Sequence, residues 1–263
     1  MRILLSSILA GVVGTGLGGL LTAMLGSKTS KMVSALLSFA GGVMISIVFY
    51  ELIPEAIELT DTTTSIIGLV TGIVVALLLD ALLDRVSLFG GHHHMGGQES
   101  AVDGHHAHAL GVEDHKLLRS GVLMLLAIGL HNLPEGLAMG AAINQNMRFG
   151  LTLAMLIGIH NVPLGMAIAA PLVSGGLHKW KAVALTLAAG LPTVVGATAG
   201  AFLGGTSDLT LSLALSIAGG AMLYAVFGEF LPQSAEINKG YVPTLIQLAG
   251  ILCGMLFTGI ALH

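Results

Sequence analysis

Long apolar stretches, each able to cross a lipid bilayer, occupy most of this chain of 263 residues. Hydrophobic residues make up 54% of the chain and charged residues 9%, against roughly a quarter charged in soluble domains. Backbone groups must be paired inside the hydrocarbon core, which leaves helices or a closed barrel. The 37 glycines, with 3 tyrosines and 1 tryptophan, favour closely packed helices. We therefore predict an all-α, multi-pass membrane protein.

Eight stretches are expected to form transmembrane helices of a single domain that covers residues 1–263. The first follows Arg2 and resembles a signal peptide, but it is long enough to span the bilayer and lacks a cleavage site followed by polar sequence. The predicted helices are 3–25, 32–54, 65–84, 117–143, 150–173, 180–203, 210–233 and 242–262.

A polar segment, residues 85–116, separates the third and fourth predicted helices. Its glycines, acidic residues and histidines predict a disordered loop that collects or senses metal, or that serves only as a tether. The histidines are His92, His93, His94, His105, His106, His108 and His115.

Two related motifs lie in the middle of the fourth and fifth apolar stretches. HNLPEG begins at His131, and HNVPLG begins at His160, 29 residues later. Polar and ionisable side chains are costly in hydrocarbon, so such a cluster indicates a functional site. On a helix, His131 and Glu135 share one face, with Asn132 beside them. Imidazole, amide and carboxylate groups of this kind suit a divalent transition metal.

Pro134 and Pro163 stand inside these motifs. Each removes a backbone donor and frees a carbonyl one turn earlier, near Leu130 and Ile159, which predicts bent helices. The alternative is a pair of kinked helices whose polar groups bond only each other. The detail of the repeat favours a metal site over packing alone.

A second repeat relates the parts of the chain that flank the motifs. Residues 38–58 match residues 216–236 at a constant offset of 178, with ten identities in twenty-one positions. The second and seventh helices run in opposite directions, as do the fourth and fifth. The sequence therefore predicts eight helices in a 3+2+3 inverted-repeat bundle, an architecture typical of alternating-access transporters.

Basic residues predict the orientation. With the N-terminus outside, eight of the ten Lys and Arg residues lie in inner loops, and only Arg2 and Arg148 lie outside. Both termini should therefore face out, and the histidine-rich loop should be cytoplasmic. The inner residues are Lys28, Lys31, Arg85, Lys116, Arg119, Lys179, Lys181 and Lys239.

Taken together, the two motifs, the GGxM…E…P phrases of the second and seventh helices and the histidine-rich loop resemble the ZIP family of zinc- and iron-transporting proteins. The resemblance covers essentially the whole chain. It implies transport of zinc or a related divalent metal across the cell membrane into the cytoplasm, without enzymatic activity or a cofactor. The positions that match the family's metal-binding motif are His131, Asn132, Glu135, His160 and Asn161.

The chain departs from this family pattern at two positions. Leu164 occupies the place where the fifth helix usually carries a glutamate, and Thr193 stands where the sixth often carries another. In family members with two adjacent metal sites, these carboxylates help to form the second site. We therefore expect one bound ion, and weaker binding of hard cations than of zinc.

Three further residues are candidates for a transport path. The repeat relates Glu51 to Glu229, which are expected to form an entry and an exit station or to face headgroups at helix ends. Met44 offers a thioether, although a methionine in a membrane helix is more often packing.

Two functions other than transport are compatible with the residues. The first is a metal sensor that binds but does not transport, and the second is an intramembrane metal-dependent hydrolase, although no HExxH motif is present. The lone Cys253 excludes a disulfide framework. No nucleic-acid partner is expected, and a homodimer is left open.

Deleting residues 92–108 should leave metal uptake intact, because no predicted helix depends on them. Uptake of radioactive zinc by proteoliposomes measures this. Complete loss of uptake in a correctly inserted deletion variant would place the loop in the transport path.

Overall fold

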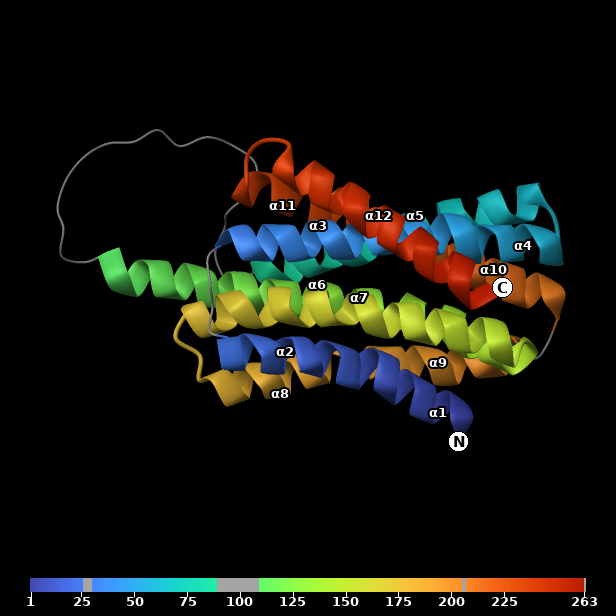
Figure 1. Ribbon diagram of the computed structural model, residues 1–263, viewed down its shortest axis with the longest axis horizontal. Coiled ribbons are helices and arrows are strands. Elements are labelled where there is room, and N and C mark those ends of the chain that lie inside the picture. The colour runs from blue at the N-terminus through green and yellow to red at the C-terminus, as the bar shows by residue number, and fades with distance from the viewer. Residues whose placement is uncertain (26–29, 89–108, 205–206, 263) are drawn as a thin grey trace.

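The computed structural model describes residues 1–25, 30–88, 109–204 and 207–262, which form helices and no strand (Figure 1). Three elements, labelled η, are π-helices, whose hydrogen bonds reach one residue further than those of an α-helix. In chain order the elements are α1 (Arg2–Ser7), η1 (Ile8–Val13), α2 (Gly14–Leu25), α3 (Ser30–Ile47), η2 (Val48–Leu52), α4 (Ile53–Leu59), α5 (Thr62–Leu88), α6 (Ala109–Gln145), α7 (Met147–Ser174), α8 (Lys179–Ala189), α9 (Leu191–Gly204), α10 (Asp208–Tyr224), η3 (Ala225–Phe230), α11 (Leu231–Ile237) and α12 (Val242–Leu262).

Within the described part of the chain, seven helical segments are long and apolar enough to cross a bilayer. They contain 20 to 30 residues each, and about 20 residues suffice for ~30 Å of hydrocarbon. Helix α12 adds a shorter apolar stretch, Val242–Phe257. Large apolar side chains such as Leu78, Phe202 and Leu256 are exposed, as contact with lipid tails requires. The predicted class, an all-α multi-pass membrane protein, is confirmed.

Helices α6 and α7 pack side by side and connect two groups of helices (Figure 1). On one side, α2 and α8 contact α7, and α9 contacts α6. On the other side, α3 contacts α7 and α10 contacts α6, while α5 and α12 cover α10 and α3. The two predicted motifs therefore lie in the centre of the bundle.

The second helical segment continues beyond Pro54, where the sequence predicted its end. Pro54 stands in the first turn of α4, directly after the π-helix η2, and Pro232 holds the same place in α11 after η3. Proline is tolerated in a first turn because the N–H that it lacks has no α-helical partner there. The prediction was wrong because the π-helix cannot be recognised in the hydrophobic pattern.

The predicted loop over 85–116 is shorter at both ends. Helix α5 continues to Leu88, and α6 begins at Ala109, so that His115 is helical. Polar residues can continue a helix beyond the bilayer, since water satisfies their side chains. The other six histidines of the loop lie outside the described residues.

The predicted helix over 180–203 is divided at Gly190 into α8 and α9. Pro192 has no N–H with which to continue the α-helical pattern. The N–H of Thr193 donates to the Gly190 carbonyl oxygen, three residues back, at 3.2 Å. The break therefore has a local cause in the sequence Gly-Leu-Pro-Thr.

Glycines bring α6 and α9 into direct backbone contact. A Cβ atom on Gly140 would overlap the carbonyl oxygen of Ala197, and one on Gly196 would overlap that of Leu133. Small residues of this kind allow membrane helices to approach closely and gain van der Waals contact. The contact fixes the distance between the HNLPEG motif and α9.

Replacing Gly140 by alanine should force α6 and α9 apart and lower the thermal unfolding midpoint in detergent, since overpacking costs about 1–3 kcal/mol. Gly129→Ala on the same helix is the control, because its Cβ would lie 4.0 Å from the nearest atom, the Ala189 oxygen. Equal midpoints for the two variants would contradict the proposed packing role.

Candidate functional site

His131, Glu135 and His160 meet in the interior of the bundle. The Oε1 atom of Glu135 lies 3.1 Å from Nε2 of His131 and 2.9 Å from Nε2 of His160. His131 is 7% exposed, and the other two are fully buried. The first two side chains lie one turn apart on α6, and the third comes from α7. The two motifs therefore contribute to one centre, as the repeat predicted.

The tautomer of His160 is set by its own helix. Its Nδ1 atom lies 3.1 Å from the carbonyl oxygen of Leu156, which can only accept, so Nδ1 carries a proton. Nε2 lies 2.9 Å from Oε1 of Glu135, so a proton lies between these two atoms, and its loss would leave the Nε2 lone pair free for a cation. A backbone carbonyl of this kind is the usual partner that orients a histidine toward a metal ion.

Both asparagines of the motifs are fully buried, and each donates to a backbone carbonyl of another helical segment. The Nδ2 of Asn132 donates to the oxygen of Ala189 at 2.7 Å. The Nδ2 of Asn161 donates to the oxygen of Ala10 at 3.0 Å. The amide nitrogens are therefore occupied by these bonds, and only the amide oxygens are available to a ligand.

Several buried polar atoms at this centre have no hydrogen-bond partner among the described residues. They belong to both motifs and to Thr193 on α9. Burying such an atom without a partner costs about 1–3 kcal/mol, so a cluster of them is typical of a binding site. The atoms are Oδ1 of Asn132, Oε2 of Glu135, Oδ1 of Asn161 and Oγ1 of Thr193, together with Nε2 of His131, whose 3.1 Å contact with Glu135 lies outside hydrogen-bond geometry.

The two positions that depart from the family pattern are neutral and buried. Leu164 and Thr193 are both 0% exposed. Leu164 holds the place of Glu135 in the repeat. The glycines that follow them, Gly165 and Gly136, have matching surroundings, because a Cβ on either would overlap a threonine carbonyl oxygen, that of Thr15 or of Thr193. Glu135 is therefore the one carboxylate that the two motifs provide.

Within the described part of the chain, no three His, Cys, Asp or Glu side chains are arranged to hold a metal ion as they stand, and this includes His131, Glu135 and His160, which are engaged with one another. A cation at this centre must therefore replace the contacts between Glu135 and the two imidazoles.

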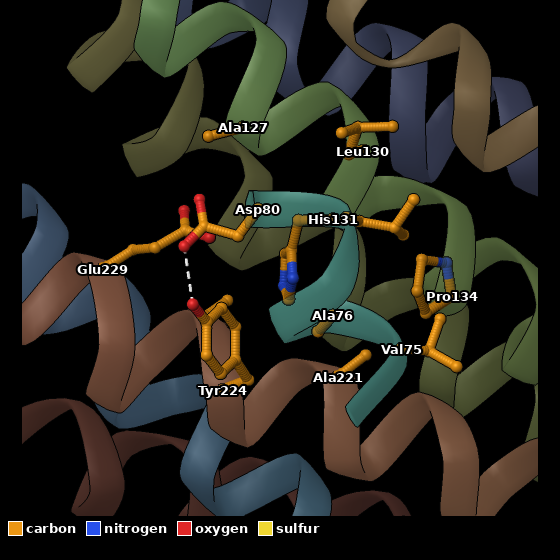
Figure 2. Close-up of a pocket in the computed structure, with 12 residues that line it drawn as sticks. Val75, Ala76, Asp80, Ala127, Leu130, His131, Pro134, Ala221, Tyr224 and Glu229 are labelled. Carbon is orange, nitrogen blue, oxygen red and sulfur yellow. Dashed lines mark hydrogen bonds between the residues drawn. The ribbon is translucent and has the colours of Figure 1, made fainter. Parts of the chain in front are cut away.

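A cavity of about 50 Å³ lies between α5, α6, α10 and η3. The ring of His131 lines it, as do Asp80, Tyr224 and Glu229 (Figure 2). The hydroxyl of Tyr224 donates to Oδ2 of Asp80 at 2.5 Å. Phe230 packs edge-on against the His131 ring, with 5.9 Å between centroids. The cavity therefore leads from carboxylates to one imidazole of the centre.

The three candidate path residues have different surroundings. Glu229 lines the cavity, whereas Glu51 is 3% exposed in η2, and its Oε1 has no hydrogen-bond partner among the described residues. Met44 is fully buried, in agreement with packing. Sequence reasoning missed the Asp80–Tyr224 pair, for which an aspartate inside an apolar helix was the available signal.

These features define a helical, multi-pass membrane protein with a histidine–glutamate centre inside the bundle. The profile of the ZIP zinc transporter family matches residues 86–261. The zinc transporter ZupT of Chlorobaculum parvum is 33% identical over 266 residues, which cover 97% of this chain and 94% of the relative. The zinc transporter ZupT of Akkermansia muciniphila is 34% identical over 271 residues, which cover 99% and 96%. The chain belongs to the ZIP zinc transporter family.

Proposed function

We propose that the protein transports zinc or a related divalent transition metal across the membrane into the cytoplasm. The relatives named above are zinc transporters. The observation that carries the proposal is the convergence of His131 and His160 on Glu135 within an apolar bundle. The metal is the cargo, so this function requires neither catalysis nor a cofactor.

His131, Glu135 and His160 are the proposed direct ligands. Imidazole nitrogen and carboxylate oxygen are common zinc ligands. The carboxylate oxygen that now accepts from His160 would bind the ion instead, and the ion would take up the Nε2 lone pairs of both rings. The proposed role of Asn132 and Asn161 is to complete or to orient this ligand set, since their amide oxygens have no hydrogen-bond partner among the described residues.

We propose that one ion is bound at a time. Two adjacent divalent ions repel each other strongly in a low-dielectric interior unless several carboxylates separate them. Leu164 and Thr193 provide no such charge, and Glu135 alone balances half of the charge on one divalent ion.

The inverted 3+2+3 arrangement is supported by paired contacts between helices. Ser34 on α3 donates from Oγ to the carbonyl oxygen of Ser234 on α11, at 2.9 Å. Ser212 on α10 donates in the same way to that of Ala56 on α4, at 2.8 Å. Adding 178 to 34 gives 212, and adding 178 to 56 gives 234, so each bond is the image of the other under the repeat.

The cavity at Glu229 is the proposed exit toward the cytoplasm, and Glu51 is the proposed entry station. Both termini lie at one end of the bundle in Figure 1, and the first turns of α6, in green, reach the opposite end. The excess of Lys and Arg in the loops at that opposite end supports a cytoplasmic location for it.

A metal sensor that does not transport is the second candidate, and the neutral residues Leu164 and Thr193 favour it. Zinc uptake by proteoliposomes that contain the purified protein separates the two functions. A transporter accumulates zinc inside the vesicles, whereas a sensor binds a stoichiometric amount and accumulates none.

Replacing His131 or Glu135 by alanine should lower zinc uptake by on the order of tenfold or more, because each removes a ligand. The exposed residues His178 and Glu236 offer matched controls, His178→Ala and Glu236→Ala, which should transport normally. Undiminished uptake by both His131→Ala and Glu135→Ala would refute the assignment of the site.

Leu164→Glu should recruit a second ion or tighten the first, although an acid in the membrane costs roughly 2.5 to 3.5 kcal/mol unless it is neutralised. The measurement is the number of zinc ions per chain in purified wild type and variant. Leu164→Gln supplies an oxygen of similar reach without the charge and is the control. Two tightly held ions in the wild type would show that the interpretation of Leu164 is wrong.

A further inference from the structure

We propose, on the basis of the function above, that Asn132 and Asn161 are positioning residues. Their amide nitrogens bind carbonyl oxygens at irregularities in two neighbouring helical segments. These bonds fix how α6 and α7 are oriented around the cation, and they connect the centre to η1 and to the break between α8 and α9.

The first of these carbonyls lies at the end of α8. In an unbroken helix the N–H of Thr193 would donate to the oxygen of Ala189, four residues back. It donates instead to Gly190, because the helix tightens at the Gly-Leu-Pro sequence. The oxygen of Ala189 thus loses this partner, and Asn132 supplies a donor at 2.7 Å.

The second carbonyl, that of Ala10, lies inside the π-helix η1. It too lacks its usual α-helical donor, here because of the π-helical turn. The N–H of Gly14 would donate to the oxygen of Ala10 in an α-helix. In η1 it donates to Leu9 and Gly11 instead. Asn161 supplies a side-chain donor to the oxygen of Ala10 at 3.0 Å.

The two acceptor residues, Ala10 and Ala189, have similar local sequences. Each is an alanine followed by a glycine, and these glycines, Gly11 and Gly190, touch. A Cβ on Gly190 would lie 2.5 Å from the carbonyl carbon of Gly11. The first segment and the α8–α9 segment therefore cross where the asparagine bonds end, so the two bonds act on one rigid contact.

Each amide has a single orientation as a result. With Nδ2 on a carbonyl, Oδ1 must point elsewhere, and in both residues it is buried without a hydrogen-bond partner among the described atoms. Rotating either amide by a half-turn would place oxygen against oxygen. The bond therefore determines where the amide oxygen, and the histidine next to it in the chain, are held.

The test exploits the different chemistry of aspartate at these positions. An ionised carboxylate is nearly the same size as the amide but cannot donate to the carbonyl oxygen. A positioning role predicts that Asn161→Asp and Asn132→Asp transport zinc on the order of tenfold less than wild type at about pH 8.

If the amides acted mainly as ligands, the result would be the reverse. A carboxylate would then add negative charge to the site and raise its affinity for zinc above that of wild type.

Asn144 provides the matched control. It lies on α6 like Asn132, and its Nδ2 donates to the carbonyl oxygen of Ala201 on α9 at 2.8 Å, but Asn144 is exposed, so water can replace the bond. Asn144→Asp should therefore transport like wild type.

A second measurement, the thermal unfolding midpoint in metal-free buffer, keeps this inference separate from the proposed function. The midpoints of Asn161→Asp and Asn132→Asp should lie below that of wild type, even if the wild type takes up no zinc. Absence of zinc uptake by wild-type vesicles would overturn the function alone. Midpoints and uptake equal to those of wild type, or zinc binding tighter than wild type at about pH 8, would overturn the positioning role.

Discussion

The absence of water from the bilayer core is the constraint on which this structure depends. Backbone groups must find partners within the protein, and helices provide them. Where the α-helical pattern changes, at η1 and at Gly190, an asparagine from another segment donates to a backbone oxygen. The buried hydroxyls of Ser34 and Ser212 meet the same constraint, since each donates to a carbonyl oxygen of a neighbouring helix. The centre at Glu135 is where several polar atoms remain unsatisfied, and this makes it the part of the bundle best suited to a cation.

Close packing gives this centre its fixed geometry. Because lipid tails are as apolar as leucine, membrane helices associate through van der Waals contact, which requires small residues at the interface. Gly140 and Gly196 hold α6 against α9, and Gly165 holds α7 against α2. The motif helices are thus restrained on the side that carries Ala10 and Ala189. Their other side faces α5 and α10, where the cavity lies.

Regularly repeated features of the chain could be predicted, and irregular ones could not. Hydrophobic length predicted the helical membrane class, and the 29-residue repeat predicted that His131, Glu135 and His160 belong to one centre. The π-helices were missed, because an extra residue in a turn leaves no trace in an apolar run. The partners of Asn132 and Asn161 were missed for the same reason, since they are backbone oxygens and a sequence does not display them. Asp80 and Tyr224 are 144 residues apart, and only the fold brings them together.

The cavity makes the two halves of the centre unequal although the sequence makes them similar. His131 reaches the cavity wall, whereas His160 is sealed behind Glu135 and held by Leu156. If the proposed exit through this cavity is used, a cation would exchange its ligands in a fixed order. It would part from His160 first, stay longest with His131 and then meet the carboxylates of Asp80 and Glu229. Such stepwise exchange would divide one large barrier into several small ones.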